Sequence, residues 1–329
     1  MTGVTARPVP GEQLADWNEL AGNDEAGTIY QDARWLVAVS EACGDELVLL
    51  GFYAGKTLVA GLPFQVRRRA GMTMARRAFA TPYSGLVRSP SLDGAMVAGI
   101  AAAVEAAVTR YSQFSMALAP FGPATVVGRG WRKTDRATWL IRLETEEKMW
   151  DRLGGALQKK IRRTERRGLT VTDNGNPEAF YALYRATFER HGLRPPFTPA
   201  SFGRLIGRLV ERGIGRVYMA TAEGRPCAAR LVLFDRRRAY CALSGFDPTM
   251  SHLRAGDCLM WNVIRSVSAM RNELDMVGAN LSGISEYKQK FRGALCPYVE
   301  LTRWKTPAER LLISLHQWVT RSRGGSARV

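Results

Sequence analysis

Residues 214–246 read IGRVYMATAEGRPCAARLVLFDRRRAYCALSGF. Three apolar runs, Ile214–Ala222, Cys227–Phe234 and Ala239–Phe246, alternate in this stretch with the short polar segments Glu223–Pro226 and Asp235–Arg238. Apolar runs of strand length that are joined by such turns predict an antiparallel meander of three strands. We therefore expect a sheet built around this stretch.

The sequence on both sides of the meander predicts the helices and strands that would complete one domain. Asn176, Pro177 and Glu178 are typical of a helix start, with a cap, a proline in the first turn and an acidic residue. The order predicted for this half is strand Leu169–Asp173, helix Asn176–His191, helix Thr198–Gly213, the meander, helix Asp257–Arg271, strand Leu274–Gly278, helix Ile284–Phe291 and strand Tyr298–Trp304. In the second of these helices, one apolar stripe is formed by Phe202, Leu205, Ile206, Leu209 and Val210.

The first half of the chain repeats this order in a weaker form. Asp32 can cap a helix over Ala33–Cys43, which Gly44 ends. Two extended runs around Gly55 predict a hairpin. The predicted elements are helix Ala33–Cys43, strands Glu46–Ala54 and Thr57–Arg68, an extended stretch through Phe79, helix Asp93–Arg110 and strand Phe114–Leu118. Recurrence at domain length predicts duplicated domains, because solenoid repeats have periods of only about 20–50 residues.

These patterns predict an α/β (α+β) fold class with two tandem domains. Each domain is expected to contain a mixed, mainly antiparallel sheet that is flanked by helices. We expect the first domain over residues 1–135 and the second over residues 136–306. Residues 307–329 are expected to form a basic C-terminal helix and tail, in which Leu311, Leu312 and Leu315 share one side.

The charge of the chain is strongly positive and unevenly distributed. Lysine and arginine number 47 against 30 aspartate and glutamate residues, a formal net charge of +17. Residues 1–66 contain three basic and nine acidic residues, so the excess of positive charge lies entirely in the remainder. Such a body favours an anionic partner, namely a nucleic acid, a phosphorylated cofactor or an anionic lipid, although arginine used only for solubility gives the same composition.

Several classes of protein are excluded by residue usage. The five cysteines are far apart and show no C-x-x-C spacing, which argues against a disulfide framework or a zinc site and favours a reducing cytoplasm. Three histidines are too few for a multi-histidine metal centre. The longest apolar run, Gly94–Val104, is shorter than the about 20 residues that a membrane-spanning helix needs. No secretory signal is visible at the N-terminus.

Six segments resemble the GNAT acyltransferases, in particular the Fem-type and BioF-like proteins with tandem GNAT domains. The segments are Lys159–Leu169, Glu223–Ala229, Ser244–Asp257, Leu274–Gly278 with Tyr287–Gly293, Tyr30–Leu36 and Ala60–Phe64. The predicted order of elements in each half also resembles that of a GNAT domain. The resemblance implies a degenerate GNAT-like first domain and a second domain that catalyses acyl transfer. The donor in such proteins is acyl-CoA or, in Fem-type enzymes, an aminoacyl-tRNA, and a neutral amine attacks the carbonyl.

The resemblance also directs attention to the site residues. Such a site must stabilise the negative charge that develops on the carbonyl oxygen and must remove a proton from the attacking ammonium. The predicted catalytic residues are Tyr240, Asp275 and Lys288. The predicted substrate-binding residues are Ser244, Tyr287 and Lys290, of which Tyr287 can return a proton to the leaving group. Two alternatives remain open, because Asp275 can pair with a lysine instead and Tyr240 can simply fill core.

The loop before the helix at Asp257 is where the resemblance places the phosphates of CoA. The GNAT pattern there is Q/R-x-x-G-x-G/A, and this chain keeps only Gly256, with Arg254 displaced by one position. We predict that the donor's phosphates contact Arg254, Gly256 and Cys258, the last through its backbone N–H. The alternative is that Gly256 only permits a turn and Asp257 only caps the helix.

A dense basic segment precedes the second domain. Six basic residues lie within nine positions, namely Lys159, Lys160, Arg162, Arg163, Arg166 and Arg167. On a helix they would occupy most of the circumference, so this helix cannot be buried in a core. It is suited to the backbone of a tRNA or to an anionic lipid headgroup, or it is a solvated helix face.

The sequence therefore predicts an N-acyltransferase that moves an acyl group from acyl-CoA to a primary amine, such as an amino sugar or a cell-envelope precursor, without a metal. No heptad stretch between Leu143 and Phe180 would form the coiled-coil arm that tRNA-dependent Fem-type enzymes often have. The alternatives are such a tRNA-dependent peptidyltransferase and a non-enzymatic nucleic-acid-binding protein, although no strand has the aromatic residues of an RNA-recognition sheet. The expected location is the cytoplasm, with peripheral contact to the inner membrane face through Pro307–Arg323 left open.

Overall fold

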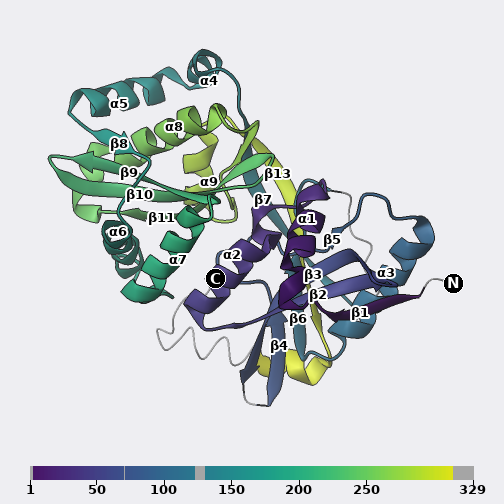
Figure 1. The fold of residues 1–329 in the computed structure, drawn as a ribbon. Helices are drawn as coiled ribbons and strands as arrows, with labels where there is room; N and C mark the ends of the chain where they lie inside the picture. The colour runs from purple at the N-terminus through teal and green to yellow at the C-terminus, as the bar shows by residue number, and fades with distance from the viewer. Residues whose placement is uncertain (1–2, 70, 123–129, 314–329) are drawn as a thin grey trace. The chain divides into compact units, whose positions relative to one another are not determined.

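The computed structural model describes residues 3–69, 71–122 and 130–313. The chain divides into two compact units (Figure 1). The first consists of the residues up to Arg136 together with the segment that begins at Pro297, and the second consists of Ala137–Cys296. The last described strand thus contributes to the first unit from Pro297 onward, whereas the sequence placed it in the second domain. The predicted tail at 307–329 lies outside the described residues beyond Ile313.

In its described residues, the first unit has six strands that lie side by side, and a seventh strand pairs with one of them. Its elements are β1 Val4–Pro8, α1 Leu14–Asn23, α2 Ala33–Cys43, β2 Glu46–Ala54, β3 Thr57–Arg69, β4 Met72–Arg76, β5 Val87–Arg88, α3 Gly94–Val108, β6 Gln113–Ala117 and β13 Ala294–Trp304. The strands lie in the order β1, β2, β3, β4, β6, β13, and β5 pairs with β3. Neighbouring strands are antiparallel except for the parallel pair β4 and β6.

The elements of the first unit that were predicted correctly from the sequence have clear caps or turns at their ends. The side chain of Asp32 accepts a hydrogen bond from the backbone N–H of Arg34, and Gly44 ends the helix in the left-handed region at φ 65°, as predicted for α2. The hairpin of β2 and β3 is also confirmed. By contrast, α1 and β1 were missed, because no side chain caps α1 and because the short strand β1 is mostly exposed.

The second unit contains the predicted meander at its centre. Its elements are β7 Arg132–Arg142, α4 Glu146–Arg152, α5 Gly155–Arg166, β8 Thr170–Thr172, α6 Pro177–Glu189, α7 Pro199–Glu211, β9 Gly215–Ala222, β10 Arg225–Phe234, β11 Arg238–Phe246, α8 Ala255–Ser268, β12 Glu273–Asp275 and α9 Ser282–Gln289. The strands lie in the order β7, β12, β11, β10, β9, β8. All neighbours are antiparallel except for the parallel pair β11 and β12.

The two units are built to the same plan. Read from the β1 and β8 edges, the strand orders are β1-β2-β3-β4-β6-β13 and β8-β9-β10-β11-β12-β7. The parallel pair occupies the same place in both orders, and in both it is joined by one helix, α3 or α8. The predicted fold class, two domains that each have a mixed and mainly antiparallel sheet flanked by helices, is therefore confirmed.

Helices cover both faces of the sheet in the second unit. Figure 1 shows α5 and α8 on one face of the strands β8 to β11 and α6 and α7 on the other face. Helix α6 comes very close to β11, because a Cβ atom at Gly245 would lie 2.4 Å from the backbone nitrogen of Tyr184. The N–H of Phe246 then donates to the hydroxyl of Thr187 on α6 at 2.9 Å. Glycine at position 245 therefore fixes the end of β11 against α6.

Three details of the second unit differ from the sequence-based expectation. The strand predicted to reach Gly278 ends at Asp275, because Val277 and Gly278 are in the left-handed region at φ 53° and 79°. Helix α8 begins at Ala255, so its N-cap is Arg254 and Asp257 does not cap it. On α7, Val210 is 49% exposed, whereas the other four residues of the predicted stripe are buried.

Among the described residues, no helix combines the length and the apolar composition that crossing a bilayer requires.

Candidate active site

An opening in the sheet of the second unit lies between β11 and β12. The two strands pair only over three residues, Arg238–Tyr240 against Glu273–Asp275. Strand β12 then ends, but β11 continues to Phe246. In the part of the chain that the structure describes, no strand pairs with β11 on that side beyond Tyr240. Among the described strands, the backbone groups on this edge of β11 therefore have no strand partner.

A β-bulge lies at the start of this unpaired part of β11. Leu231 of β10 pairs with Leu243 and its neighbour Val232 pairs with Cys241, so Ala242 is an extra residue in β11. A bulge bends its strand and increases the local twist. The bulge therefore lies two residues beyond the point where the pairing of β11 with β12 stops.

Lys288 on α9 places its ammonium group at the end of β12. The Nζ atom donates to the carbonyl oxygens of Val277 and, at 2.6 Å, of Gly278. Burial and the nearby charge of Arg230 lower the pKa of Lys288 to about 8, while Cys241 and Asp275 oppose this shift. An ammonium has three N–H donors, so within the described residues these two bonds leave one donor for a ligand.

Arg230 in the centre of β10 is a site residue that the sequence analysis missed. Its side chain is 5% exposed, it lies opposite Ser244 of β11, and its charge acts on Cys241, Tyr287 and Lys288. Within the described residues, its buried Nε has no hydrogen-bond partner. The available signal was a single charged residue inside the otherwise apolar run Cys227–Phe234.

Asp275 holds the loop that follows β12. Its carboxylate is fully buried and accepts hydrogen bonds from the hydroxyl of Thr138 at 2.5 Å and from the backbone N–H of Val277 at 2.7 Å. The same Thr138 hydroxyl also accepts from the N–H of Gly278 at 3.2 Å. These bonds fix the two carbonyl groups that hold the ammonium of Lys288.

Tyr240 is buried but its hydroxyl points to a different part of the unit. It donates to Asp235 at 2.5 Å, in the turn between β10 and β11, and burial raises its pKa well above the usual value. Ser244 lies at the unpaired end of β11, opposite Arg230. The structure thus brings Ser244 to the opening, whereas it places the hydroxyl of Tyr240 at the far end of the strand.

The N-terminus of α8 forms the other side of the opening. The exposed Arg254 is in the left-handed region at φ 55°, and no side chain caps the helix. Tyr287 of α9 reaches this end, because its hydroxyl donates to the carbonyl of Gly256 at 2.7 Å. Burial raises the pKa of Tyr287, so the phenol stays protonated at neutral pH. The first N–H groups of a helix lack intrahelical acceptors and attract anions.

The remaining predicted residues lie at the edges of this site. The thiol of Cys258 is buried, and burial raises its pKa to about 12, so only its backbone N–H is suited to an anion. Lys290 is exposed and its Nζ lies 5.4 Å above the ring of Tyr287. No group of three or more metal-ligating side chains occurs among the residues that the structure describes.

The basic helix α5 lies next to the N-terminus of α8. The hydroxyl of Thr164 on α5 donates to the carbonyl of Leu253 at 3.1 Å, which ties the helix to the loop before α8. Leu157, Ile161 and Thr164 form its buried side. Its exposed basic residues, including the C-cap Arg167, are Lys159, Lys160, Arg162, Arg163, Arg166 and Arg167, and Glu165 is exposed among them. A polyanion bound at Arg254 would therefore meet further positive charge on α5.

Gly256→Val is expected to weaken binding of a phosphate-bearing donor at least about 10-fold, because donor phosphates need close approach to the backbone. A Cβ atom at this position would lie 3.1 Å from the ring of Phe246 and 3.7 Å from the Tyr287 hydroxyl. The matched control is Gly155→Val in the first turn of α5, where a Cβ would meet nothing within 4 Å. Calorimetric titration with CoA measures the effect. Equal affinity in the two folded variants would place the phosphates elsewhere.

Most of the second unit matches a known protein-family model. Residues 155–289 match the family model described as Acetyltransferase (GNAT) domain. No curated protein sequence gives a significant match to this chain.

Three solved structures share the fold of nearly the whole chain at low sequence identity. FemX is 10% identical, with 90% of this chain and 96% of that chain covered at a TM-score of 0.67. The structure of L-PGS from Bacillus licheniformis is 11% identical, with 95% and 97% covered at a TM-score of 0.58. A tandem GNAT protein from the clavulanic acid biosynthesis pathway is 14% identical, with 92% and 99% covered at a TM-score of 0.54. The two units thus have the fold of a tandem GNAT protein.

Proposed function

We propose that the chain is a GNAT acyltransferase whose second unit, in which residues 155–289 match the GNAT domain, transfers an acyl group from acyl-CoA to a primary amine. The observation that carries the proposal is the opening between β11 and β12, where Lys288, Tyr287 and the N-terminus of α8 converge. The acceptor class we propose is an amino sugar or a cell-envelope amine.

The opening can hold the extended arm of CoA. The unpaired edge of β11 beyond Tyr240 offers backbone hydrogen bonds to the amide groups of that arm. The diphosphate would lie at the N–H groups of Gly256 and Cys258, with the exposed Arg254 beside it. The cations of α5 would add long-range attraction for the phosphates of the donor.

The third N–H of Lys288 is suited to the carbonyl oxygen of the thioester. When the neutral amine attacks, the new C–N bond forms and the oxygen becomes negative, so a fixed ammonium stabilises this charge most in the transition state. Collapse of the intermediate breaks the C–S bond. The leaving thiolate takes the proton of the Tyr287 hydroxyl, which recovers a proton from water, and the nitrogen releases its extra proton to water. The products are the amide and free CoA.

Asp275 has a supporting part in this scheme. Its carboxylate already accepts bonds from Thr138 and from Val277, and these bonds hold the carbonyl groups that orient Lys288. We therefore propose that Asp275 positions Lys288, whereas the sequence analysis counted Asp275 itself among the catalytic residues. Tyr240 is proposed to support the turn at Asp235 rather than to contact the substrate.

A second candidate donor is an aminoacyl-tRNA, and one observation favours it. The exposed cations of α5 form a long basic surface beside α8, and a tRNA backbone could follow such a surface. One structure with the same fold is that of FemX, although a likeness at 10% identity shows the fold alone.

Release of free thiol tests the proposal. The purified chain is incubated with acetyl-CoA and a panel of primary amines that includes glucosamine, and the thiol is measured colorimetrically. Amine-dependent thiol release at a rate well above the uncatalysed rate is the expected result. In parallel, binding of charged tRNA is titrated against salt, where a log–log slope of about −0.9 per neutralised phosphate would indicate a tRNA track. Transfer from tRNA combined with no binding of acyl-CoA would overturn the proposal in favour of the second donor.

A further inference from the structure

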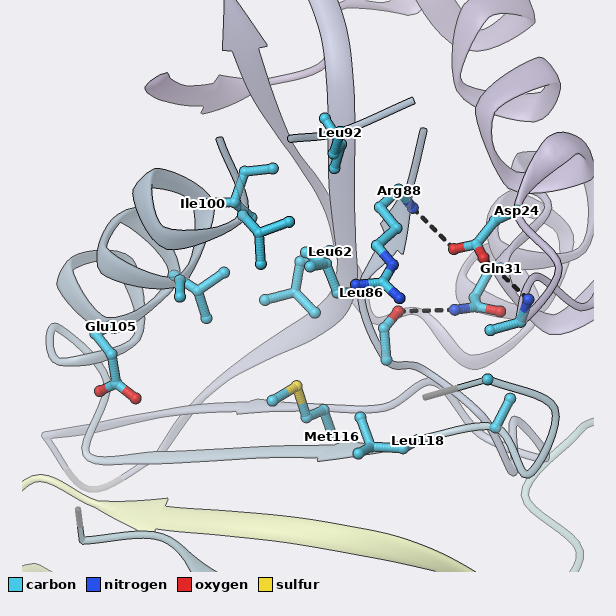
Figure 2. Close-up of a pocket in the computed structure, with 17 residues that line it drawn as sticks. Asp24, Gln31, Leu62, Leu86, Arg88, Leu92, Ile100, Glu105, Met116 and Leu118 are labelled. Carbon is cyan, nitrogen blue, oxygen red and sulfur yellow. Dashed lines mark hydrogen bonds between the residues drawn. The ribbon is translucent and has the colours of Figure 1, made fainter. Parts of the chain in front are cut away.

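The first unit contains an apolar cavity of its own (Figure 2). Its volume is about 140 Å³, and all the residues that line it belong to the first unit. The apolar wall includes Leu62, Leu86, Ile100, Val104, Met116 and Leu118. One side is formed by α3, which contains the longest apolar run of the sequence.

The position of the cavity in the first unit can be compared with the corresponding elements of the second unit. It lies at the carboxyl end of β6 and against α3. In the second unit, the corresponding strand β12 and helix α8 form the opening that we propose as the donor site. The first unit thus has an apolar cavity beside β6 and α3, which correspond to β12 and α8 at the proposed donor site of the second unit.

One cation faces this apolar space. In Figure 2 the side chain of Arg88 extends from its backbone near Asp24 toward Leu62 and Leu86. Its backbone N–H donates to Asp24 at 2.9 Å, but within the described residues its guanidinium has no hydrogen bond or ion pair. The nearby amide of Gln31 is used, because it donates to the carbonyl of Gly85 at 2.8 Å. Arg88 is half-buried, so an anion in the cavity would meet it away from bulk water.

Size and charge together select the ligand. An apolar cavity of about 150 Å³ accommodates benzene, so this cavity has room for about six carbon atoms. A planar guanidinium binds a carboxylate through two parallel hydrogen bonds. The rim also contains the carboxylates of Asp24 and Glu105, which disfavour an anion of higher charge such as a phosphate. We propose that the first unit binds a short-chain carboxylate of about six carbons, with its tail in the cavity and its carboxylate on Arg88.

Calorimetric titration of the full chain with hexanoate tests this proposal. Hexan-1-ol has the same tail without the charge, and we expect it to bind at least about 10-fold more weakly. Arg88→Gln should weaken hexanoate about 10-fold and leave hexan-1-ol unchanged. The control Arg110→Gln, at an exposed arginine just beyond α3, should affect neither ligand. Equal affinity of the wild type for both ligands, or no binding of hexanoate, would overturn the proposal.

A second pair of variants tests the location. Ala101→Phe places a ring in the cavity and should abolish binding of both ligands, whereas Ala102→Phe, at the exposed neighbouring position of α3, should not. If Ala101→Phe does not fold, Ala119→Phe fills the cavity from another side. Hexanoate binding that survives in a folded cavity-filling variant would contradict the assignment. Saturating CoA should leave hexanoate binding unchanged. If CoA displaced hexanoate, the two ligands would share a site, which would contradict a carboxylate site separate from the donor site.

Discussion

Lys288→Met is expected to lower kcat about 100- to 1000-fold, which is the usual loss when one donor to a developing oxyanion is removed. The KM of the donor should change little, because the ammonium acts most strongly on the charge of the transition state. Lys288→Arg keeps a cation and should retain part of the activity. Steady-state kinetics of amine-dependent thiol release measure the effect. A Lys288→Met variant with wild-type kcat would remove Lys288 from the mechanism.

The protonation of Lys288 is expected to determine how kcat falls at alkaline pH. Because the pKa of Lys288 is about 8, the cation that we propose to stabilise the oxyanion is lost as the pH rises through 8, and kcat should fall there. In Lys288→Arg the limb should move to higher pH, since a guanidinium stays protonated. Arg230→Met should also move it upward, because the positive charge of Arg230 helps to lower this pKa. An identical limb in all three proteins would show that another group titrates.

A stability measurement distinguishes a buried lysine from an exposed one without reference to activity. The pKa of Lys288 is about 8 in the folded chain and 10.5 in the unfolded chain, so between these values the unfolded state binds more protons. The free energy of unfolding should therefore rise with pH in this window, by at most about 1.4 kcal/mol per pH unit. Subtracting the curve of Lys288→Met isolates this contribution. A difference that does not change between pH 8 and 10.5 would contradict the burial of the ammonium.

Asp275→Ala is expected to lower the free energy of unfolding by about 2–4 kcal/mol and to lower kcat as well, because it leaves buried donors unpaired. The donors are the hydroxyl of Thr138 and the N–H of Val277. The matched control is Asp173→Ala, which removes an exposed ion pair with Arg216 and should cost under about 1 kcal/mol. Urea unfolding and kinetics on both variants measure the two effects.

The outcomes for Asp275 separate its two interpretations. Loss of stability with loss of kcat supports a positioning role for the loop that holds Lys288. Loss of kcat at unchanged stability would instead support a direct catalytic role of Asp275. Wild-type behaviour in both measurements would exclude either role.

The elements that could be predicted from the sequence are those that have clear capping residues and turn signals at their ends. The hairpin at Gly55, helix α2 with its cap Asp32, and the meander of β9, β10 and β11 all agree with the structure. Capping residues, positive-φ glycines and apolar runs act within a few residues, so they can be recognised without knowledge of the fold. Edge strand β1 and the uncapped helix α1 lack such signals and were missed.

The site depends on contacts that no local pattern contains. Lys288 and Asp275 could be named from sequence, but their arrangement depends on Thr138, which lies 137 residues before Asp275. The bulge at Ala242 exists only relative to the register of β10. The outermost strand pairs, β13 with β6 and β7 with β12, likewise join residues that are far apart in the chain. These features follow from tertiary pairing.

Hydrogen–deuterium exchange with and without saturating CoA tests the central claim most directly. The claim is that the opening between β11 and β12, together with the N-terminus of α8, binds the donor. We predict slower exchange in peptides that cover residues 241–258 and no change in peptides that cover α3 and β6. Unchanged exchange at 241–258, with protection confined to residues 85–119 of the first unit, would contradict the account.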